Sequence, residues 1–399
     1  MSQRYLAGFI QAGLFNPLVA PVGGAYVQYS GMWAPQSQMQ AVAAGTWTGL
    51  PPLYAWGKNN FGQLGLGNTT SYSSPKQVGA LTTWLNIACG AYNTLATKTD
   101  GTLWSWGYNA YGQLGLGNTT NYSSPKQVGA LTTWLNIADG GVWTLATKTD
   151  GTLWSWGYNV QGQLGLGNTT NYSSPKQVGA LTTWLNIACG AANTLATKTD
   201  GTLWSWGYNG SGQLGLGNTT DYSSPKQVGA LTTWSKIAGG STHTLATKTD
   251  GTLWSWGSNA YGQLGLGNIT YYSSPKQVGA LTTWLNIAGG GNHTLATKTD
   301  GTLWSWGYNG LGQSGLGNTT YYSSPKQVGA LTTWLNIAGG LHHTLATKTD
   351  GTLWSWGYNL QGQLGLGNIT NYSSPKQVGA LTTWLNIAGG QNHTLAIHT

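Results

Sequence analysis

TLATKTDGTLWSWG, residues 94–107, contains two short runs of strand-favouring residues joined by Asp-Gly, a pair preferred in tight hairpin turns. The stretch therefore predicts two adjacent antiparallel strands. Close copies of it recur every 50 residues without an insertion, in seven units that begin at positions 51, 101, 151, 201, 251, 301 and 351. A period of this length is typical of a solenoid, a propeller or an array.

Two further β-prone runs complete each unit. WLNIA, residues 84–88, precedes the hairpin, and PKQV, residues 125–128, follows the glycine-rich segment GQLGLGN, residues 112–118. Each unit therefore predicts one four-stranded antiparallel blade, and we expect the WLNIA run to be the innermost strand.

The length of the hairpin turn fixes which side chains share a face of the blade. With a two-residue turn, we expect one bulky face and one mostly small face. The bulky set would be Leu95, Thr97, Trp104 and Trp106, and the small set Ala96, Lys98, Leu103 and Ser105. Blades packed side by side would bury both faces, which accounts for the many tryptophans without a ligand.

The two ends of the repeat indicate how the fold closes. The repeat begins at LYAWG, residues 53–57, in a third strand, and ends at TLAIHT, residues 394–399, in a second strand. We therefore predict an all-β protein, a closed seven-bladed β-propeller with a composite closing blade. Its first two strands would come from residues near 384–399 and its last two from residues near 53–78.

The motif WSWGYNxxGQLGLG, with the later stretch NIAxGxxHTLA, resembles the regulator of chromosome condensation repeat family. The resemblance covers residues 51–399 and implies a seven-bladed propeller. The best-known member of that family exchanges nucleotide on a small GTPase and binds chromatin, using charged loop residues and an inserted β-wedge. This chain has no such insertion and few such charges, so exchange activity would rest on the fold alone.

The composition argues against catalysis. Charged residues make up 6% of the chain, against roughly 25% in an ordinary soluble protein, and there is no glutamate. Carboxylate-pair chemistry is therefore improbable, and GQLGLG does not match a phosphate-binding fingerprint. We predict that the protein is not an enzyme and that it needs no cofactor.

The net charge of +8 does not indicate nucleic-acid binding, because seven of the fifteen lysines are one repeated residue spread around a ring. Nucleic-acid binders usually gather Lys and Arg into one patch, and this chain has a single arginine, Arg4. The repeated lysines are Lys76, Lys126, Lys176, Lys226, Lys276, Lys326 and Lys376.

Cysteines and histidines also recur at equivalent positions. Cys89 and Cys189 lie two units apart, too far to bridge in a propeller, so we expect free thiols. The four equivalent histidines could ring the channel as metal ligands, but structural imidazoles are the better interpretation, and we predict no metal site. They are His243, His293, His343 and His393. Polar residues and a proline interrupt the apolar run at the start of the chain well short of a membrane span.

The units differ mainly in three short windows, which in one predicted blade are residues 92–93, 110–111 and 121. Since strands alternate in direction, all three windows should emerge on the same side of the ring, here called the variable face. Free drift of loop tips is the alternative to selection for recognition. The predicted partner-binding residues are Tyr92, Trp143, His243, Tyr261, Tyr271, His293, Leu311, Tyr321, His342 and His343.

Residues 1–50 stand apart from the repeat, with many apolar and aromatic residues and almost no charge. We predict an N-terminal arm that docks on protein subunits of a larger assembly, although a floppy terminus is the alternative. The arm residues expected to be buried on docking are Phe15, Tyr26, Tyr29 and Trp33.

Together these features predict a non-enzymatic binding or structural propeller. Low charge and near-identical repeats suggest a virion or extracellular surface component, anchored by its arm and presenting the variable face to a receptor protein, glycan or neighbouring subunit. The alternative is a cytoplasmic scaffold or small-GTPase regulator, as the family resemblance allows. A hydrolase that uses the channel mouth is a third hypothesis, which a unique pair of acids would have favoured.

Overall fold

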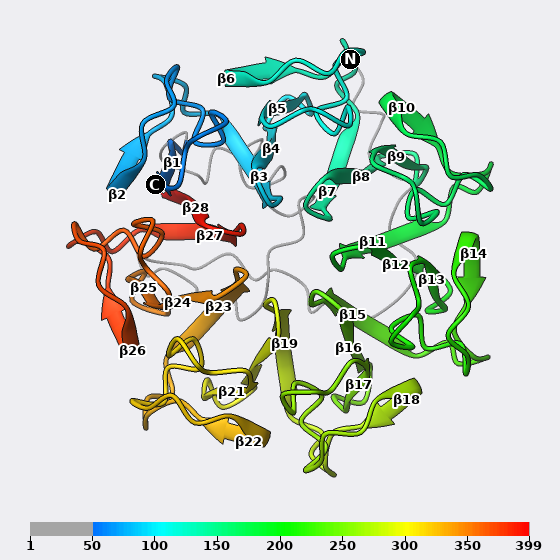
Figure 1. The fold of residues 1–399 in the computed structure, drawn as a ribbon, viewed down its shortest axis with the longest axis vertical. Helices are drawn as coiled ribbons and strands as arrows, with labels where there is room; N and C mark the ends of the chain where they lie inside the picture. The colour runs from blue at the N-terminus through cyan, green and yellow to red at the C-terminus, as the bar shows by residue number, and fades with distance from the viewer. Residues whose placement is uncertain (1–50, 399) are drawn as a thin grey trace, which may run out of the picture. The chain divides into compact units, whose positions relative to one another are not determined.

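The structure is a computed structural model that describes residues 51–398, and in this range it consists of strands and loops. Twenty-eight strands form seven four-stranded antiparallel sheets arranged as blades around a central channel (Figure 1). No helix that could cross a membrane is present among these residues. The prediction of a closed seven-bladed β-propeller is confirmed.

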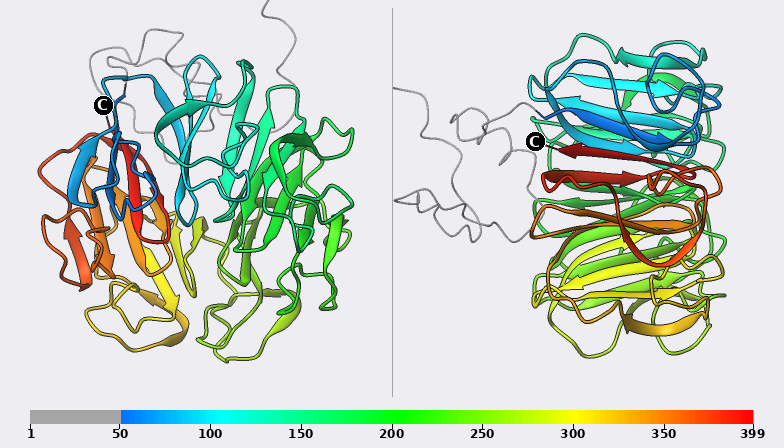
Figure 2. Two further views of the ribbon diagram at one scale, coloured as in Figure 1. Left: turned by 45° about the horizontal axis from the view of Figure 1, so that its top comes forward. Right: turned by 90° about the vertical axis from the view of Figure 1, so that its left-hand side faces the viewer.

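One blade shows the pattern of all. Its strands, from the channel outwards, are β3 (Trp84–Cys89), β4 (Asn93–Lys98), β5 (Leu103–Gly107) and β6 (Tyr122–Gln127). The WLNIA run lies innermost, as expected, because β3, β7, β11, β15, β19, β23 and β27 surround the channel (Figure 1). Figure 2 shows the strands running across the thickness of the ring, so that the connecting loops lie on its two faces.

The other continuous blades repeat this order. Two are β7 (Trp134–Asp139), β8 (Trp143–Lys148), β9 (Leu153–Gly157), β10 (Tyr172–Gln177), and β11 (Trp184–Cys189), β12 (Asn193–Lys198), β13 (Leu203–Gly207), β14 (Tyr222–Gln227). Two more are β15 (Trp234–Gly239), β16 (His243–Lys248), β17 (Leu253–Gly257), β18 (Tyr272–Gln277), and β19 (Trp284–Gly289), β20 (His293–Lys298), β21 (Leu303–Gly307), β22 (Tyr322–Gln327). The sixth is β23 (Trp334–Gly339), β24 (His343–Lys348), β25 (Leu353–Gly357), β26 (Tyr372–Gln377).

The closing blade joins the two ends of the described chain. Its strands are β27 (Trp384–Gly389), β28 (His393–His398), β1 (Leu53–Gly57) and β2 (Tyr72–Gln77). Leu53 pairs with Ile397 and Gly57 with His393, in an unbroken antiparallel register. The composite blade predicted from the two ends of the repeat is therefore confirmed.

The predicted division of side chains between the two faces of a blade is wrong. Thr94 pairs with Trp106 and Ala96 with Trp104, so both tryptophans share a face with the small residues. The reason is the turn, which has three residues rather than two: the amide of Lys98 donates to the carbonyl of Thr102 over 3.0 Å. Gly101, with a φ of 76°, supplies the left-handed position that this longer turn requires. One extra residue moves every side chain of the partner strand to the other face.

Adjacent blades nevertheless bury both faces against each other, as predicted. Leu103 and Val128 of one blade form a buried cluster with Trp134, Ala146 and Trp156 of the next. The indole of Trp156 also donates to the carbonyl of Gln113, in the glycine-rich loop of the preceding blade, over 2.9 Å. Each blade–blade contact thus combines apolar burial with a buried hydrogen bond.

Candidate partner-binding face

Two kinds of loop meet on each face of the ring. Within one blade, the amide of Tyr108 donates to the carbonyl of Tyr92 over 2.9 Å, which joins the β3–β4 loop to the β5–β6 loop. On the opposite face, the amide of Trp134 donates to the carbonyl of Gly101 over 3.1 Å. All three variable windows therefore share one face, as predicted. The opposite face, built from the β4–β5 type of turn and the connections between blades, is here called the constant face.

A buried asparagine holds each long loop of the variable face in shape. The Nδ2 of Asn109 donates to the carbonyls of Asn118 and Thr120, and its Oδ1 accepts from the amide of Leu114 over 2.9 Å. Gln113 Oε1 accepts from the amide of Tyr111 over 3.0 Å. Because these contacts recur in most blades, the residues that vary are displayed on a preorganised frame.

Four of the ten predicted partner-binding residues are buried. They are Trp143, His243, His293 and His343, all 0% exposed. Each begins the second strand of its blade and points into the blade–blade contact rather than outwards. The Nε2 of His293, for example, lies 3.0 Å from Thr344 Oγ1 in the next blade. Their assignment to a partner-contacting surface is therefore wrong.

Burial explains the chemistry of these histidines. Loss of solvation lowers the pKa of His243 and His393 to about 4, and that of His293 and His343 to about 3. The imidazoles are neutral at pH 7 and serve as structural hydrogen-bonding groups. Within residues 51–398, no cluster of His, Cys or Asp side chains is arranged to hold a metal ion.

The buried histidines predict an acid-sensitive fold. On unfolding, each imidazole regains a pKa near 6.5, so the unfolded chain binds more protons and stability falls as the pH drops from about 6.5 towards 4. Replacing His243, His293, His343 and His393 by asparagine, which the chain uses at positions 93 and 193, should flatten this dependence. We expect the wild type to lose about 1 to 2 kcal/mol per histidine between pH 7 and 5 relative to the variant.

Urea unfolding of both proteins at the two pH values would measure the difference. Burial raises the pKa of Asp139 to about 7, so this group stabilises the fold as the pH falls, which is opposite to the effect of the histidines. Because Asp139 is present in both proteins, its contribution cancels when they are compared. Equal pH dependence in the two proteins would show that the histidines are not buried in their neutral form.

The two cysteines are the last residues of the innermost strands β3 and β11. Cys89 and Cys189 are free thiols, as expected. Burial and the neighbouring Asp139 carboxylate raise the pKa of both. The thiols are therefore protonated and poorly reactive at neutral pH.

The six remaining candidates lie at the surface. Tyr271, Tyr321 and Tyr261 are 50%, 45% and 38% exposed, and Tyr92, Leu311 and His342 are half-buried. Tyr261 and Tyr321 contact each other, with ring centroids 5.7 Å apart, although they belong to loops of adjacent blades.

These rings belong to a larger cluster that spans three blades. Tyr308 lies 4.8 Å from Tyr321, 5.0 Å from Tyr261 and 5.9 Å from His342, and His342 in turn contacts Tyr358. We call these five residues the Tyr321 cluster. A second group, the Tyr92 cluster, consists of Phe61, Tyr92, Tyr108, Tyr111 and Tyr158.

Comparison of the units missed several of these rings. Tyr108, Tyr158, Tyr308 and Tyr358 occupy a position that is tyrosine in most units, so it gives no signal of variation. For Tyr108 a sequence signal exists, the spacing of three residues to the aromatic Tyr111 of the same loop. No such signal marks the other three tyrosines, because positions 161, 311 and 361 are not aromatic.

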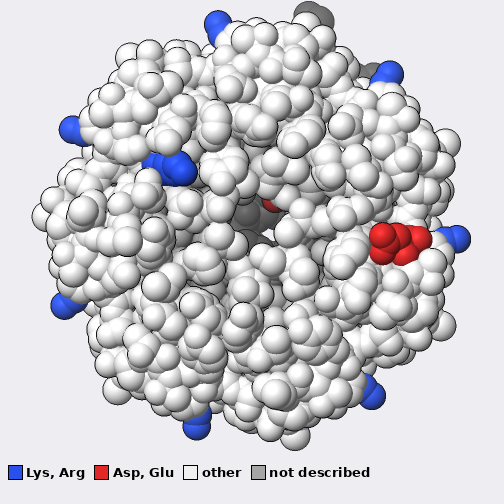
Figure 3. Space-filling model, in the orientation of Figure 1, with Lys and Arg blue, Asp and Glu red and all other residues white. Residues whose placement is uncertain are grey.

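The variable face is almost uncharged inside its rim of lysines (Figure 3). In the two kinds of loop that form it, the charged residues are Lys58 and Asp221. Asp221 Oδ1 already accepts from the amide of Asn209 over 2.7 Å. A partner on this face would therefore meet aromatic rings, amides and hydroxyls rather than charges.

Sequence profiles of the regulator of chromosome condensation (RCC1) repeat match residues 52–97, 100–146, 150–197, 200–247, 250–297, 300–347 and 350–397. The chain belongs to the regulator of chromosome condensation repeat family. A second profile of the same repeat matches five segments, the first of them residues 84–113. No curated protein sequence matches this family member.

Solved structures similar to this RCC1-repeat protein share its fold. Prp20p from Saccharomyces cerevisiae, studied for binding to Gsp1p and histones, is 22% identical, with 88% of this chain and 91% of that chain covered and a TM-score of 0.79. Human WBSCR16 is 23% identical, with coverage of 88% and 99% and a TM-score of 0.78. Yeast RCC1 (Prp20) bound to Kap60 is 20% identical, with coverage of 97% and 96% and a TM-score of 0.81.

Proposed function

We propose that this RCC1-repeat propeller is a non-enzymatic protein-binding module whose partner docks on the variable face, over the Tyr321 cluster. The observation that carries the proposal is a continuous set of partly exposed aromatic rings across three blades, held by rigid loops with almost no charge. Aromatic side chains that combine a large apolar area with a polar tip are typical anchors of protein interfaces.

The aspartates of the constant face give no comparable basis for catalysis. Asp300 Oδ1, for example, accepts from the amide and from the hydroxyl of Thr302, at 2.9 and 2.6 Å. These bonds lower the pKa of the Asp300 carboxylate. At Asp350 burial raises the pKa, but the same bonds from Thr352 and the nearby Lys348 outweigh it, so both carboxylates act as turn-stabilising acceptors rather than as proton donors.

The comparisons support protein binding more than a role in a surface appendage. Prp20p was studied with Gsp1p and histones, and yeast RCC1 with Kap60, so propellers of this fold do bind proteins. At 20% to 22% sequence identity the similarity shows the fold alone. The partners of those proteins are therefore not assigned to this chain. We therefore favour the intracellular scaffold reading over the virion reading, for which the comparisons give no support.

Two parts of the sequence interpretation stay predictions. The location of the protein, in the cytoplasm or at a virion or cell surface, is one of them. The docking arm is the other, because Phe15, Tyr26, Tyr29 and Trp33 lie outside the described residues. Nucleotide exchange on a GTPase is not proposed, since the loops of residues 51–398 keep the 50-residue period and carry no wedge-like insertion.

Replacing Tyr261 and Tyr321 together by alanine should weaken partner binding at least tenfold without altering the fold, because the change removes two interface anchors. The wild-type chain would be immobilised and exposed to native extract, and the retained protein identified by mass spectrometry. Its dissociation constant would then be measured by calorimetry with the wild type and the variant.

The matched control replaces Lys126 and Lys176 by alanine on the outer strands, where each ammonium lies over a tyrosine ring about 5.4 Å away. We expect this variant to bind normally. If the lysine pair abolishes binding while the tyrosine pair leaves it intact, the partner contacts the rim and not the variable face.

A further inference from the structure

Main-chain hydrogen bonds join neighbouring blades through the loops that follow the innermost strands. These inner loops, of which residues 90–92 form one, lie on the variable face. The amide of Ala91 donates to the carbonyl of Gly141 in the next blade over 3.0 Å, and equivalent bonds of 3.0 to 3.3 Å occur at five other junctions. At the remaining junction, the bond from Gly141 to Ala191 is not made within the described chain. The ring of inner-loop bonds is therefore open at one place.

An acidic side chain takes the place of the missing bond. Asp139 Oδ1 accepts from the amide of Gly141 over 2.8 Å, so this amide does not reach the next blade. Gly141 has a φ of 101°, whereas the equivalent Gly291 does not have a left-handed backbone. The residue equivalent to Asp139 is cysteine or glycine in the other six blades. The opening of the ring thus follows from this one carboxyl group.

The same carboxyl group faces a buried amide of the preceding blade. The Nδ2 of Asn93 donates to Asp139 Oδ2. Asn93 is 0% exposed, and its Oδ1 has no hydrogen-bond partner among the described residues. A Cβ added to Gly90 would lie 2.3 Å from both Asn93 Oδ1 and Asp139 Oδ1, so these two oxygens lie beside the same point. Two neighbouring acceptors in a buried site favour a proton between them.

A proton on Asp139 Oδ1 completes the pairing with Asn93. The acid then donates from Oδ1 to Asn93 Oδ1 and still accepts from Asn93 Nδ2 at Oδ2, so two hydrogen bonds join acid and amide. A protonated oxygen is a weaker acceptor than a carboxylate oxygen, so Asp139 holds the amide of Gly141 less strongly. That amide is then free to donate to the carbonyl of Ala191, as the equivalent amides do at the other six junctions.

Asp139 gains this proton near neutral pH. Loss of solvation raises its pKa to about 7, although the bonds from Gly141 and Asn93 act in the opposite direction. The side chain is half-buried, so protons from the solvent can reach it. The acid is therefore mostly protonated below pH 7 and mostly ionised above it.

Four other titratable groups lie on the described strands that pack against β7. They are Cys89, Cys189, Lys98 and Lys148. Burial and the Asp139 carboxylate raise the pKa of both thiols, which are therefore uncharged at neutral pH. Neither cysteine adds a charge beside Asp139.

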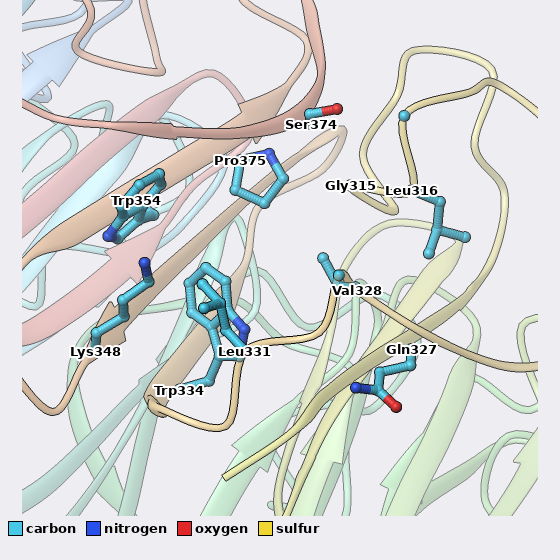
Figure 4. Close-up of a pocket in the computed structure, with 12 residues that line it drawn as sticks. Gly315, Leu316, Gln327, Val328, Leu331, Trp334, Lys348, Trp354, Ser374 and Pro375 are labelled. Atoms are coloured by element: carbon cyan, nitrogen blue, oxygen red, sulfur yellow. The ribbon is translucent and has the colours of Figure 1, made fainter.

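The two lysines lie at the far end of their strands. Lys148 pairs with Trp134, the first residue of β7, whereas Asp139 is the last residue of that strand. Each ammonium lies over an indole ring, as Figure 4 shows for the equivalent Lys348 beside Trp354, in a pocket of about 370 Å³ between two blades. On the strands that pack against β7, no cation therefore lies beside Asp139 to keep it ionised.

We propose that protonation of Asp139 switches the inner loops of the variable face from an open to a closed ring of hydrogen bonds. In the open state, the ionised acid holds the amide of Gly141 within its own blade. In the closed state, the acid is paired with Asn93, and the amide of Gly141 donates to the carbonyl of Ala191. The switch is independent of the partner proposed for the Tyr321 cluster, which lies in three other blades.

The switch reaches the surface through the Tyr92 cluster. The amide of Ala91, beside Tyr92, donates to the carbonyl of Gly141, and the amide of Tyr158 donates to the carbonyl of Val142 over 3.1 Å. Both tyrosines are therefore bonded to the segment that moves when Gly141 changes its acceptor. The arrangement of these rings on the variable face depends on pH.

Selective labels on the full-length chain allow each step to be followed by NMR. Carbon-13 in the aspartate carboxyl groups gives eight signals, and the signal of Asp139 is the one missing from an Asp139→Asn variant. Carbonyl carbon-13 and amide nitrogen-15 in alanine select the two Ala–Ala bonds, at residues 43–44 and 191–192, and so report the carbonyl of Ala191. The same labels in glycine report the amide of Gly141 through the bond between residues 140 and 141.

We expect the Asp139 carboxyl to titrate with a midpoint of about 7. The carbonyl of Ala191 should shift downfield with the same midpoint as the pH falls, because it gains a hydrogen bond. The amide of Gly141 and the ring signals of Tyr92 and Tyr158 should follow the same curve. The Ala191 signal is decisive, since the amide of Gly141 would shift on titration of Asp139 even if it kept its present acceptor.

Asp139→Asn should abolish the pH dependence of the Ala191 carbonyl. Asp139→Cys introduces the residue of the two neighbouring blades, and it gives the same test if the first variant folds poorly. The matched control is Asp221→Asn, which removes another acid of the variable face that accepts from a loop amide, over 2.7 Å, and should leave the response unchanged.

The proposal is overturned if the Asp139 carboxyl does not titrate between pH 6 and 8, or if it titrates while the carbonyl of Ala191 stays in place. It is also overturned if the response persists without Asp139, or if Asp221→Asn abolishes it.

Discussion

A chain that lacks residues 393–399 should lose cooperative unfolding and aggregate. These residues include β28, which pairs with β1 on one side and with β27 on the other. Removing it separates the two halves of the closing blade and exposes two unpaired strand edges, which are templates for aggregation. Thermal unfolding followed by circular dichroism, together with light scattering, would measure both effects.

The control for this deletion is a double substitution in the same blade that keeps all four strands. Tyr54 and His398 stand where the other blades have a tryptophan and a lysine, and their rings lie 4.8 Å apart. Replacing Tyr54 by tryptophan and His398 by lysine reproduces the arrangement of the other six blades and should leave the melting temperature unchanged or slightly higher. A deletion variant that melts like the wild type would contradict the composite closing blade.

Substitution of Gly165 by alanine should reduce the free energy of unfolding by about 3 kcal/mol. This loss is the sum of the cost of overpacking and the cost of a left-handed backbone at a residue that has a Cβ. Gly165 has a φ of 73°, and an added Cβ would lie 2.5 Å from the Nε1 of Trp206. That indole is buried and bonded to the carbonyl of Gln163, so it has little room to move. Urea unfolding monitored by fluorescence would give the difference.

Gly179 provides a matched control in the same blade. Its φ is 60°, but an added Cβ would meet no atom within 4 Å. Its replacement by alanine should therefore incur only the backbone penalty, about 1 kcal/mol. Equal losses at the two positions would show that the contact with Trp206 does not limit this loop.

The number of blades and the closure were predictable from the sequence because both depend on the period and on where it breaks. The register within the hairpin was not, since Asp-Gly suits a two-residue turn as well as a three-residue turn ending in a left-handed glycine. The choice between them depends on hydrogen bonds such as Lys98 to Thr102, which composition does not reveal.

Only part of the candidate site could be predicted, again because spatial contacts are not visible in the sequence. Variation between units identified loop positions that share one face of the ring, because loops change more readily than strands. It did not separate exposed from buried positions, and so His243 and Trp143, the first residues of their strands, were included wrongly. It also missed Tyr308, a near-constant residue that becomes the centre of a cluster only when loops from neighbouring blades meet.

The pairing of β1 with β28 also determines how the ring responds to mechanical force. Leu53 lies opposite Ile397, so the described chain enters and leaves the closing blade at the same end of one antiparallel strand pair. Tension applied at these two points loads the hydrogen bonds one after another, as in a zipper, instead of shearing them all together. A tether through both ends would therefore peel β1 from β28 at low force and open the ring at that seam while six blades remain intact.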